Sequence, residues 1–101
     1  MIRHVVCWKL YDEAQGNSKR ENSVVIKEQL LNLKNRIPQI QNIEVGINYE
    51  KADLKNYDIV LVADFESIES LKTYQKHPAH KEFVQFIDPL RSDKIAVDYE
   101  R

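Results

Sequence analysis

The sequence has 101 residues, of which 43% are hydrophobic and 31% charged, and its formal net charge at pH 7 is −1. This composition fits one globular domain over residues 1–101, and the low content of glycine and proline excludes a disordered or collagen-like chain. The balanced charge, with no concentrated basic stretch, argues against nucleic acid as a partner. No apolar run approaches the roughly 20 residues of a membrane span, so no membrane partner is predicted either.

The cysteine content bears on the compartment. Cys7 is the single cysteine, so it cannot form an internal disulfide or a cysteine metal framework. The apolar run within Met1–Lys9 is too short for a signal peptide. A cytoplasmic location is the simplest interpretation.

The first half of the chain predicts a strand, a helix and a second strand. Residues Ile2–Leu10 alternate in two partly apolar sets, as in a strand covered on both faces. A polar loop, Asp12–Asn17, leads to a Ser-x-x-Glu capping box at Ser18–Glu21, where a helix should begin. Its buried stripe consists of Ile26, Leu30, Leu33 and Ile37, and Val25 and Leu31 flank this stripe. Pro38 ends the helix. Alternation over Ile43–Ile47 predicts the second strand.

The second half predicts a strand at Tyr57–Phe65 and a helix capped by Ser67 that carries Ile68, Leu71 and Tyr74 on one side. A further helix starts at Pro78 and a last strand covers Ile95–Tyr99.

The order of these elements is β-α-β-β-α(α)-β, which is the ferredoxin-like α+β arrangement with a four-stranded antiparallel sheet and helices on one face. The other sheet face is then apolar and uncovered. Since soluble monomers rarely expose so large an apolar patch, a homodimer is predicted.

The segment Tyr74–His80 holds two imidazoles and one phenol. Histidine exchanges protons near neutral pH, and a phenol can donate a hydrogen bond to a carbonyl or an oxyanion. By helical phase, His80 shares its face with Phe83 and Ile87 and should point toward the sheet. His77 stands at the cap position of the same helix and either caps it or contributes to a site. Taken alone, a histidine on an apolar helix face is more often a packing residue than a catalyst.

Two further polar residues are candidates for the same pocket. His4 alternates in one set with Val6 and Trp8, so it approaches the pocket if that set faces the helices. Asp98 is placed to orient a histidine, although an aspartate at a strand edge is usually solvated. The histidines are a weak zinc pattern, and no nucleotide-binding or nucleophile-elbow motif is present. Neither a metal nor another cofactor is predicted.

Several short stretches carry a family resemblance: His4–Lys9, Gly46–Asn48, Asp58–Leu61, Phe65–Ser67, Tyr74–His80 and Val97–Glu100. Together they resemble the stress-responsive A/B barrel family, known as Dabb, over nearly the whole chain. The most specific is the Tyr-x-x-His-Pro-x-His pattern. The resemblance implies a dimeric α+β barrel in which two ferredoxin-like sheets pack face to face, and this agrees with the uncovered apolar face.

The resemblance also implies candidate chemistry. The family includes plant stress-associated proteins and a plant polyketide cyclase, whose acid/base pair for an aldol condensation corresponds to Tyr74 and His80. The cyclase has a further cavity histidine where this chain has Ile59. The wider group of dimeric α+β barrels contains monooxygenases and isomerases that act on small aromatic compounds without a metal.

Two hypotheses follow. The first is a cofactor-free enzyme or binder of a small apolar carbonyl or aromatic compound, with cyclase- or lyase-like acid/base chemistry. Its catalytic residues are His80 as the base and Tyr74 as the hydrogen-bond donor, and its substrate-binding residues are His4, Trp8, His77, Phe83, Ile87 and Asp98. The second is a non-enzymatic, stress-associated homodimer whose histidines pack and cap. A cavity joining Tyr74 and His80 discriminates the two.

Overall fold

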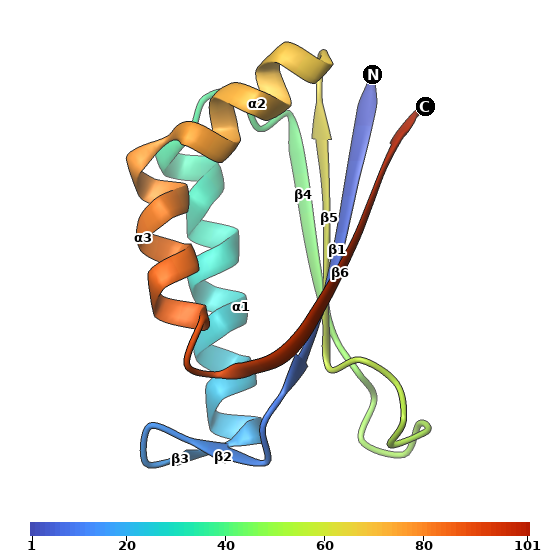
Figure 1. The fold of residues 1–101 in the computed structure, drawn as a ribbon. Helices are drawn as coiled ribbons and strands as arrows, with labels where there is room; N and C mark the ends of the chain where they lie inside the picture. Colours follow the sequence, from blue (N-terminus) through green and yellow to red (C-terminus); the bar gives the residue numbers. More distant parts are fainter.

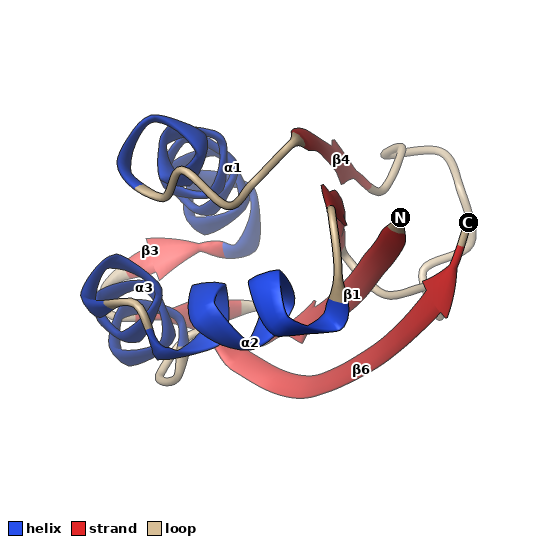
Figure 2. Ribbon diagram, turned by 90° about the horizontal axis from the view of Figure 1, so that it is seen from above, coloured by secondary structure: helices blue, strands red, loops and turns tan.

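The computed structural model describes all of residues 1–101. The elements in chain order are β1 (Ile2–Leu10), β2 (Glu13–Ala14), β3 (Asn17–Ser18), α1 (Lys19–Arg36), β4 (Asn42–Ile47), β5 (Ile59–Phe65), α2 (Ile68–Lys76), α3 (Pro78–Ile87) and β6 (Arg91–Glu100). Four strands form one antiparallel sheet in the order β4-β5-β1-β6. All three helices lie against one face of it (Figures 1 and 2). The predicted ferredoxin-like α+β fold is confirmed.

The hydrophobic core lies between the sheet and the helices. It is formed by Ile26, Leu30, Leu33 and Ile37 from the α1 segment, by Val6, Trp8, Leu10, Ile59, Leu61, Ala63 and Phe65 from the sheet, and by Leu71, Tyr74, Phe83 and Ile87 from the other helices. The capping box is present: the Ser18 hydroxyl accepts from the Glu21 N–H at 3.1 Å, and the Glu21 carboxylate accepts from the Ser18 N–H at 2.9 Å. The start of α1 is therefore fixed as predicted, and with it the face that the helix buries.

Three flanking residues that the sequence grouped with the buried stripes are largely exposed. Val25 and Leu31 on α1 are 41% and 40% exposed, and Ile68 at the start of α2 is 41% exposed. The buried stripe of α1 instead continues toward its start through Asn22 and Ser23. Asn22 is accommodated because its side-chain amide donates to the Ala14 carbonyl at 3.2 Å.

The polar stretch after β1 is not a simple loop. It contains the short β2-β3 hairpin, whose turn residues Gln15 and Gly16 have φ angles of 55° and 79°. Two consecutive residues with positive φ give the turn that matches strand twist in a two-residue hairpin. The prediction of a loop was wrong here because glutamine is an unusual residue for the first of these positions.

The last strand is longer than its sequence pattern indicated. β6 pairs with β1 from Arg91 to Glu100, although the alternation predicted a strand only from Ile95. Most of β6 is solvent-exposed, so its first residues carry no apolar pattern and are held by backbone pairing. β5 shows the opposite difference, since it begins at Ile59 rather than at Tyr57.

The far face of the sheet is apolar and has no helix over it. Across the strands, Val5 pairs with Val62 and Val97, and Cys7 pairs with Val60 and Ile95, so these residues share one face. Val97 is 61% exposed and Ile95 50% exposed. No helix of the structure has the length and apolar character that crossing a membrane requires.

The packing of α1 gives a matched pair of leucine substitutions. Leu30 has 0% exposure, so Leu30→Ala should lower the free energy of unfolding by about 2–5 kcal/mol through lost burial and a residual cavity. The neighbouring Leu31→Ala should change it by less than about 1 kcal/mol, because that side chain lies on the solvent side. Urea unfolding of both variants, followed by circular dichroism, measures the difference. Equal losses would contradict the assigned helix face.

Candidate active site

The junction between α2 and α3 positions the main polar residues of the site. Ser67 caps α2 by accepting the Ser70 N–H at 3.2 Å, and the helix then ends at His77. His77 is also the N-cap of α3, where its Nδ1 accepts the Ala79 N–H at 3.0 Å, and Pro78 begins the new helix. The chain therefore changes direction between Tyr74 and His80.

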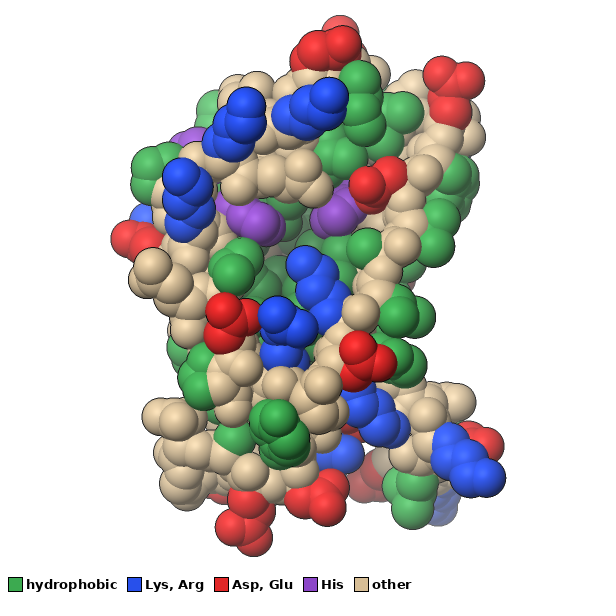
Figure 3. Space-filling model, viewed as in Figure 1, with side chains coloured by type: hydrophobic (Ala, Val, Ile, Leu, Met, Phe, Trp, Pro, Cys, Tyr) green, Lys and Arg blue, Asp and Glu red, His purple; other side chains and the backbone are tan.

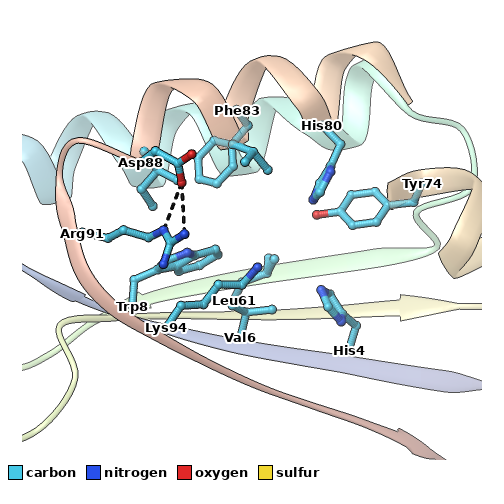
Figure 4. A pocket seen from close by; sticks show the side chains of 12 residues that line it. His4, Val6, Trp8, Leu61, Tyr74, His80, Phe83, Asp88, Arg91 and Lys94 are labelled. Atoms are coloured by element: carbon cyan, nitrogen blue, oxygen red, sulfur yellow. Dashed lines mark hydrogen bonds and ion pairs between the residues drawn. The ribbon is translucent and has the colours of Figure 1, made fainter. Parts of the chain in front are cut away.

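This change of direction brings the Tyr74 and His80 rings together. Their centroids are 4.6 Å apart, and both face the sheet over the same pocket (Figure 4). His80 Nδ1 lies 3.1 Å from the Gln75 carbonyl oxygen. A carbonyl can only accept, so Nδ1 carries the proton and Nε2 of the neutral ring keeps its lone pair.

The environment of His80 favours the neutral imidazole. Burial lowers its pKa below the ordinary value of 6.5, and the hydrogen bond to Gln75 opposes this. The positive charge of Lys94, and that of a protonated His4, lower the pKa of His80 further. At neutral pH, His80 therefore offers an unprotonated nitrogen, which is what a general base needs.

Tyr74 supplies a hydroxyl that keeps its proton. The side chain is 2% exposed, and burial raises its pKa well above the usual value of 10.0. In Figure 4 the hydroxyl points toward His80, and no hydrogen bond joins it to the other residues drawn. Tyr74 can therefore act as a hydrogen-bond donor to an oxygen atom in the pocket and not as a base at neutral pH.

A second histidine faces Tyr74 from the sheet. His4 is 6% exposed, and its ring centroid lies 6.0 Å from that of Tyr74. The carboxylate of Asp98, its partner in the β1–β6 pairing, accepts a hydrogen bond from His4 Nδ1. Asp98 thereby fixes the orientation and the tautomer of His4.

Apolar side chains make the rest of the pocket wall. The Trp8 and Phe83 rings meet edge to face with centroids 5.8 Å apart, and Val6, Leu61, Val84 and Ile87 complete the apolar lining. Asp88, Arg91 and Lys94 also line the pocket. Figure 3 shows the hollow between the helices and β6, with histidine and basic side chains in it. The cavity has a volume of about 30 Å³, which admits water but requires opening for a larger molecule.

The structure brings together most of the residues singled out from the sequence. His4, Trp8, Tyr74, His80, Phe83 and Ile87 all line this pocket. Asp98 stands behind His4, and His77 is not part of the lining, since its side chain caps α3. Sequence reasoning missed Asp88, Arg91 and Lys94. Lys94 could have been placed on the pocket face because it alternates in phase with Asp98. The predicted strand began only at Ile95, however, one residue after Lys94.

No group of three or more histidine, cysteine, aspartate or glutamate side chains is placed to hold a metal ion. The polar groups that face the pocket are instead suited to moving a proton and binding an oxygen atom.

The helices cover one face of the sheet, and the histidine–tyrosine pocket lies between the helices and that face. This arrangement defines a ferredoxin-like α+β protein with a small apolar site. The chain belongs to the stress responsive A/B barrel domain (Dabb) family, whose model matches residues 2–101. The resemblance noted in the sequence is thus confirmed.

Solved structures show the same fold. A dimeric protein with a ferredoxin-like fold from Bacteroides fragilis NCTC 9343 is 28% identical, with 99% of this chain and 95% of that chain covered and a TM-score of 0.81. A dimeric ferredoxin-like protein from Thermobifida fusca YX is 27% identical, with coverage of 99% and 90% and a TM-score of 0.83. The hydroxynitrile lyase of Passiflora edulis shares the fold at 17% identity, with coverage of 97% and 90% and a TM-score of 0.79. None of the curated proteins matches the chain by sequence.

The geometry of His80 predicts its titration. We expect a pKa below 6.5, and a neutral form protonated at Nδ1, because burial and Lys94 disfavour the imidazolium while Gln75 accepts from Nδ1. Nitrogen-15 NMR of the imidazole rings between about pH 5 and about pH 8 measures both properties, with His80→Gln to assign the signals. A pKa at or above 6.5, or a proton on Nε2, would contradict the site as described.

Proposed function

We propose that the pocket binds and converts a small apolar carbonyl or aromatic compound by cofactor-free acid/base chemistry, with residues 1–101 acting as one domain. The observation that carries the proposal is the placement of an unprotonated His80 Nε2 beside the Tyr74 hydroxyl in an apolar pocket. Apolar walls with a few convergent polar groups are typical of small-molecule sites. The fold alone does not carry the proposal, because proteins of different activities share it.

The two residues divide one chemical step. His80 Nε2 takes a proton from the carbon next to the substrate carbonyl. The electron pair of that C–H bond forms a carbon–carbon double bond, and the π pair of the carbonyl moves to its oxygen. Tyr74 donates a hydrogen bond to this oxygen as its negative charge develops. His80, now protonated, returns a proton to the same carbon, and in D2O it returns deuterium after its own proton has exchanged with the solvent. His4, held by Asp98, is the third polar group beside the reacting atoms and orients the substrate.

A homodimer is the second part of the proposal. The uncovered face of β1, β5 and β6 presents rows of apolar side chains, with Val97 61% exposed. The neighbours from Bacteroides fragilis and Thermobifida fusca are dimeric. A second copy packed on this face would cover the apolar rows and leave the pocket, on the opposite side of the sheet, inside each protomer. The cytoplasmic location predicted from the single free Cys7 is kept in this proposal.

The second candidate function is a non-enzymatic, stress-associated homodimer. The size of the pocket favours it, since a cavity of about 30 Å³ holds little more than water. In this alternative the histidines serve packing and capping, as His77 does at α3.

The acid/base proposal is tested by hydrogen exchange into acetophenone, a small aromatic ketone. In D2O, the wild-type protein should accelerate deuterium uptake at the methyl group, measured by proton NMR. His80→Gln should reduce this rate by about 10²–10⁴-fold and Tyr74→Phe by about 10²–10³-fold, because the base and the oxyanion donor are removed. His77→Gln removes the cap of α3 but no group that lines the pocket, so it should cost much less than His80→Gln.

Circular dichroism verifies that each variant is folded. Full exchange activity in a folded His80→Gln variant would refute the assignment of the base. If the wild type neither accelerates exchange nor shows ligand-dependent shifts of the Trp8 indole signal, the non-enzymatic candidate replaces the proposal.

The dimer is tested by sedimentation at micromolar concentration. The wild type should sediment at twice its chain mass of 11.9 kDa, and Val62→Lys should give a folded monomer, because a charge in the middle apolar row opposes its burial. Leu31→Lys, on the exposed side of α1, is the control and should stay dimeric. A monomeric wild type would contradict this part of the proposal.

A further inference from the structure

The mouth of the pocket carries two cationic side chains and one carboxylate. Arg91 Nε and Nη2 each lie 3.1 Å from Asp88 Oδ1, so these two residues pair with each other (Figure 4). The ammonium group of Lys94 takes part in no hydrogen bond or ion pair; only its backbone N–H is engaged, by Asp93. Lys94 is solvent-exposed, so its positive charge at the mouth has water but no protein group as a partner.

Lys94 belongs to the site and not to the outer surface of the sheet. It pairs with Trp8, as Asp98 pairs with His4 in the same β1–β6 register. Since alternate side chains of a strand share a face, Lys94 and Asp98 both lie on the side that faces the helices. Figure 4 shows the Lys94 side chain reaching into the pocket from β6. Its charge also acts on His80, whose pKa it lowers.

The acidic side chains nearby are already used. Asp88 pairs with Arg91, and Asp98 accepts from His4. The pocket lining therefore has no carboxylate left for Lys94, whose side chain is solvent-exposed at the mouth. An anionic group is the complement that such an ammonium binds most strongly, because a charge-assisted hydrogen bond is about twice as strong as a neutral one.

We propose that the pocket takes a small carboxylic acid and that Lys94 binds its carboxylate. The proposal rests on the proposed function, because it names the substrate class of that site. A carboxylate at Lys94 places the rest of a small keto or aryl acid against Trp8 and Phe83, with its carbonyl toward Tyr74 and His80, once the pocket opens beyond its present volume. A doubly charged phosphate fits less well, since the second cation, Arg91, is held by Asp88.

The test compares two probes of nearly equal shape, phenylacetate and the neutral phenylacetamide. The wild type should bind phenylacetate at least about tenfold more tightly, as measured by NMR titration of the Trp8 and His80 signals. Lys94→Met should abolish this preference, and the charge-conserving Lys94→Arg should retain part of it. Lys81→Met, which removes an exposed lysine of α3 outside the pocket, should keep it in full.

A second measurement reports on the charge itself. Phenylacetate bound at Lys94 should raise the pKa of His80, because the carboxylate offsets the charge that lowers it, and Lys94→Met alone should raise it as well. Equal affinity for the two probes in the wild type, or an undiminished preference in Lys94→Met, overturns the carboxylate proposal. If acetophenone still exchanges under His80 control, the proposed function survives that result. If no probe binds and acetophenone does not exchange, both fail.

Discussion

The alternation of side chains along β1 sets both surfaces on which the proposed function depends: the pocket face and the uncovered apolar face. His4, Val6, Trp8 and Leu10 are buried toward the helices, whereas Val5 and Cys7 point to the uncovered face. β1 lies between β5 and β6 and is paired with both, so its register is fixed from two sides. A slip of one residue would place the pocket residues on the outer face. The same register puts Asp98 opposite His4 and Lys94 opposite Trp8, which completes the polar part of the pocket.

The second constraint is the break between α2 and α3. On one continuous helix, residues six positions apart differ by about 120° in direction, so Tyr74 and His80 would face different ways. His77 and Pro78 end one helix and start the next, and the two rings then lie 4.6 Å apart. The role of His77 is therefore visible in its cap hydrogen bond: it positions the pair without lining the pocket.

Much of the fold could be predicted from the sequence, because local signals agreed with tertiary packing. The Ser18–Glu21 capping box, the Pro78 start and the apolar alternation of β1 each correspond to a feature of the structure. The inward phase of His80, Phe83 and Ile87 likewise predicted residues that line one pocket. The start of β6 was not predictable in this way, because exposed residues held by backbone pairing carry no apolar pattern. Lys94 was missed for that reason.

The pocket differs from the rest of the molecule in how many of its polar side chains have hydrogen-bond partners within the protein. Away from the pocket, buried polar side chains have protein partners: Asp58 accepts the Leu10 N–H at 2.8 Å, and Asp64 accepts from Arg3 at 2.9 and 3.1 Å. The buried Gln39 oxygen is an exception.

In the pocket, by contrast, the Tyr74 hydroxyl, the lone pair of His80 Nε2 and the Lys94 ammonium are all without protein partners. Lys94 is solvent-exposed and His80 half-buried, so these groups can reach water at the mouth of the pocket. A packed core would present apolar side chains at such positions. Their convergence is accounted for if a ligand with a carbonyl oxygen, an acidic C–H and a negative charge supplies what the protein does not. The small volume means that the proposed ligand requires the pocket to open at its rim, where Lys94 and Arg91 extend from the edge strand β6.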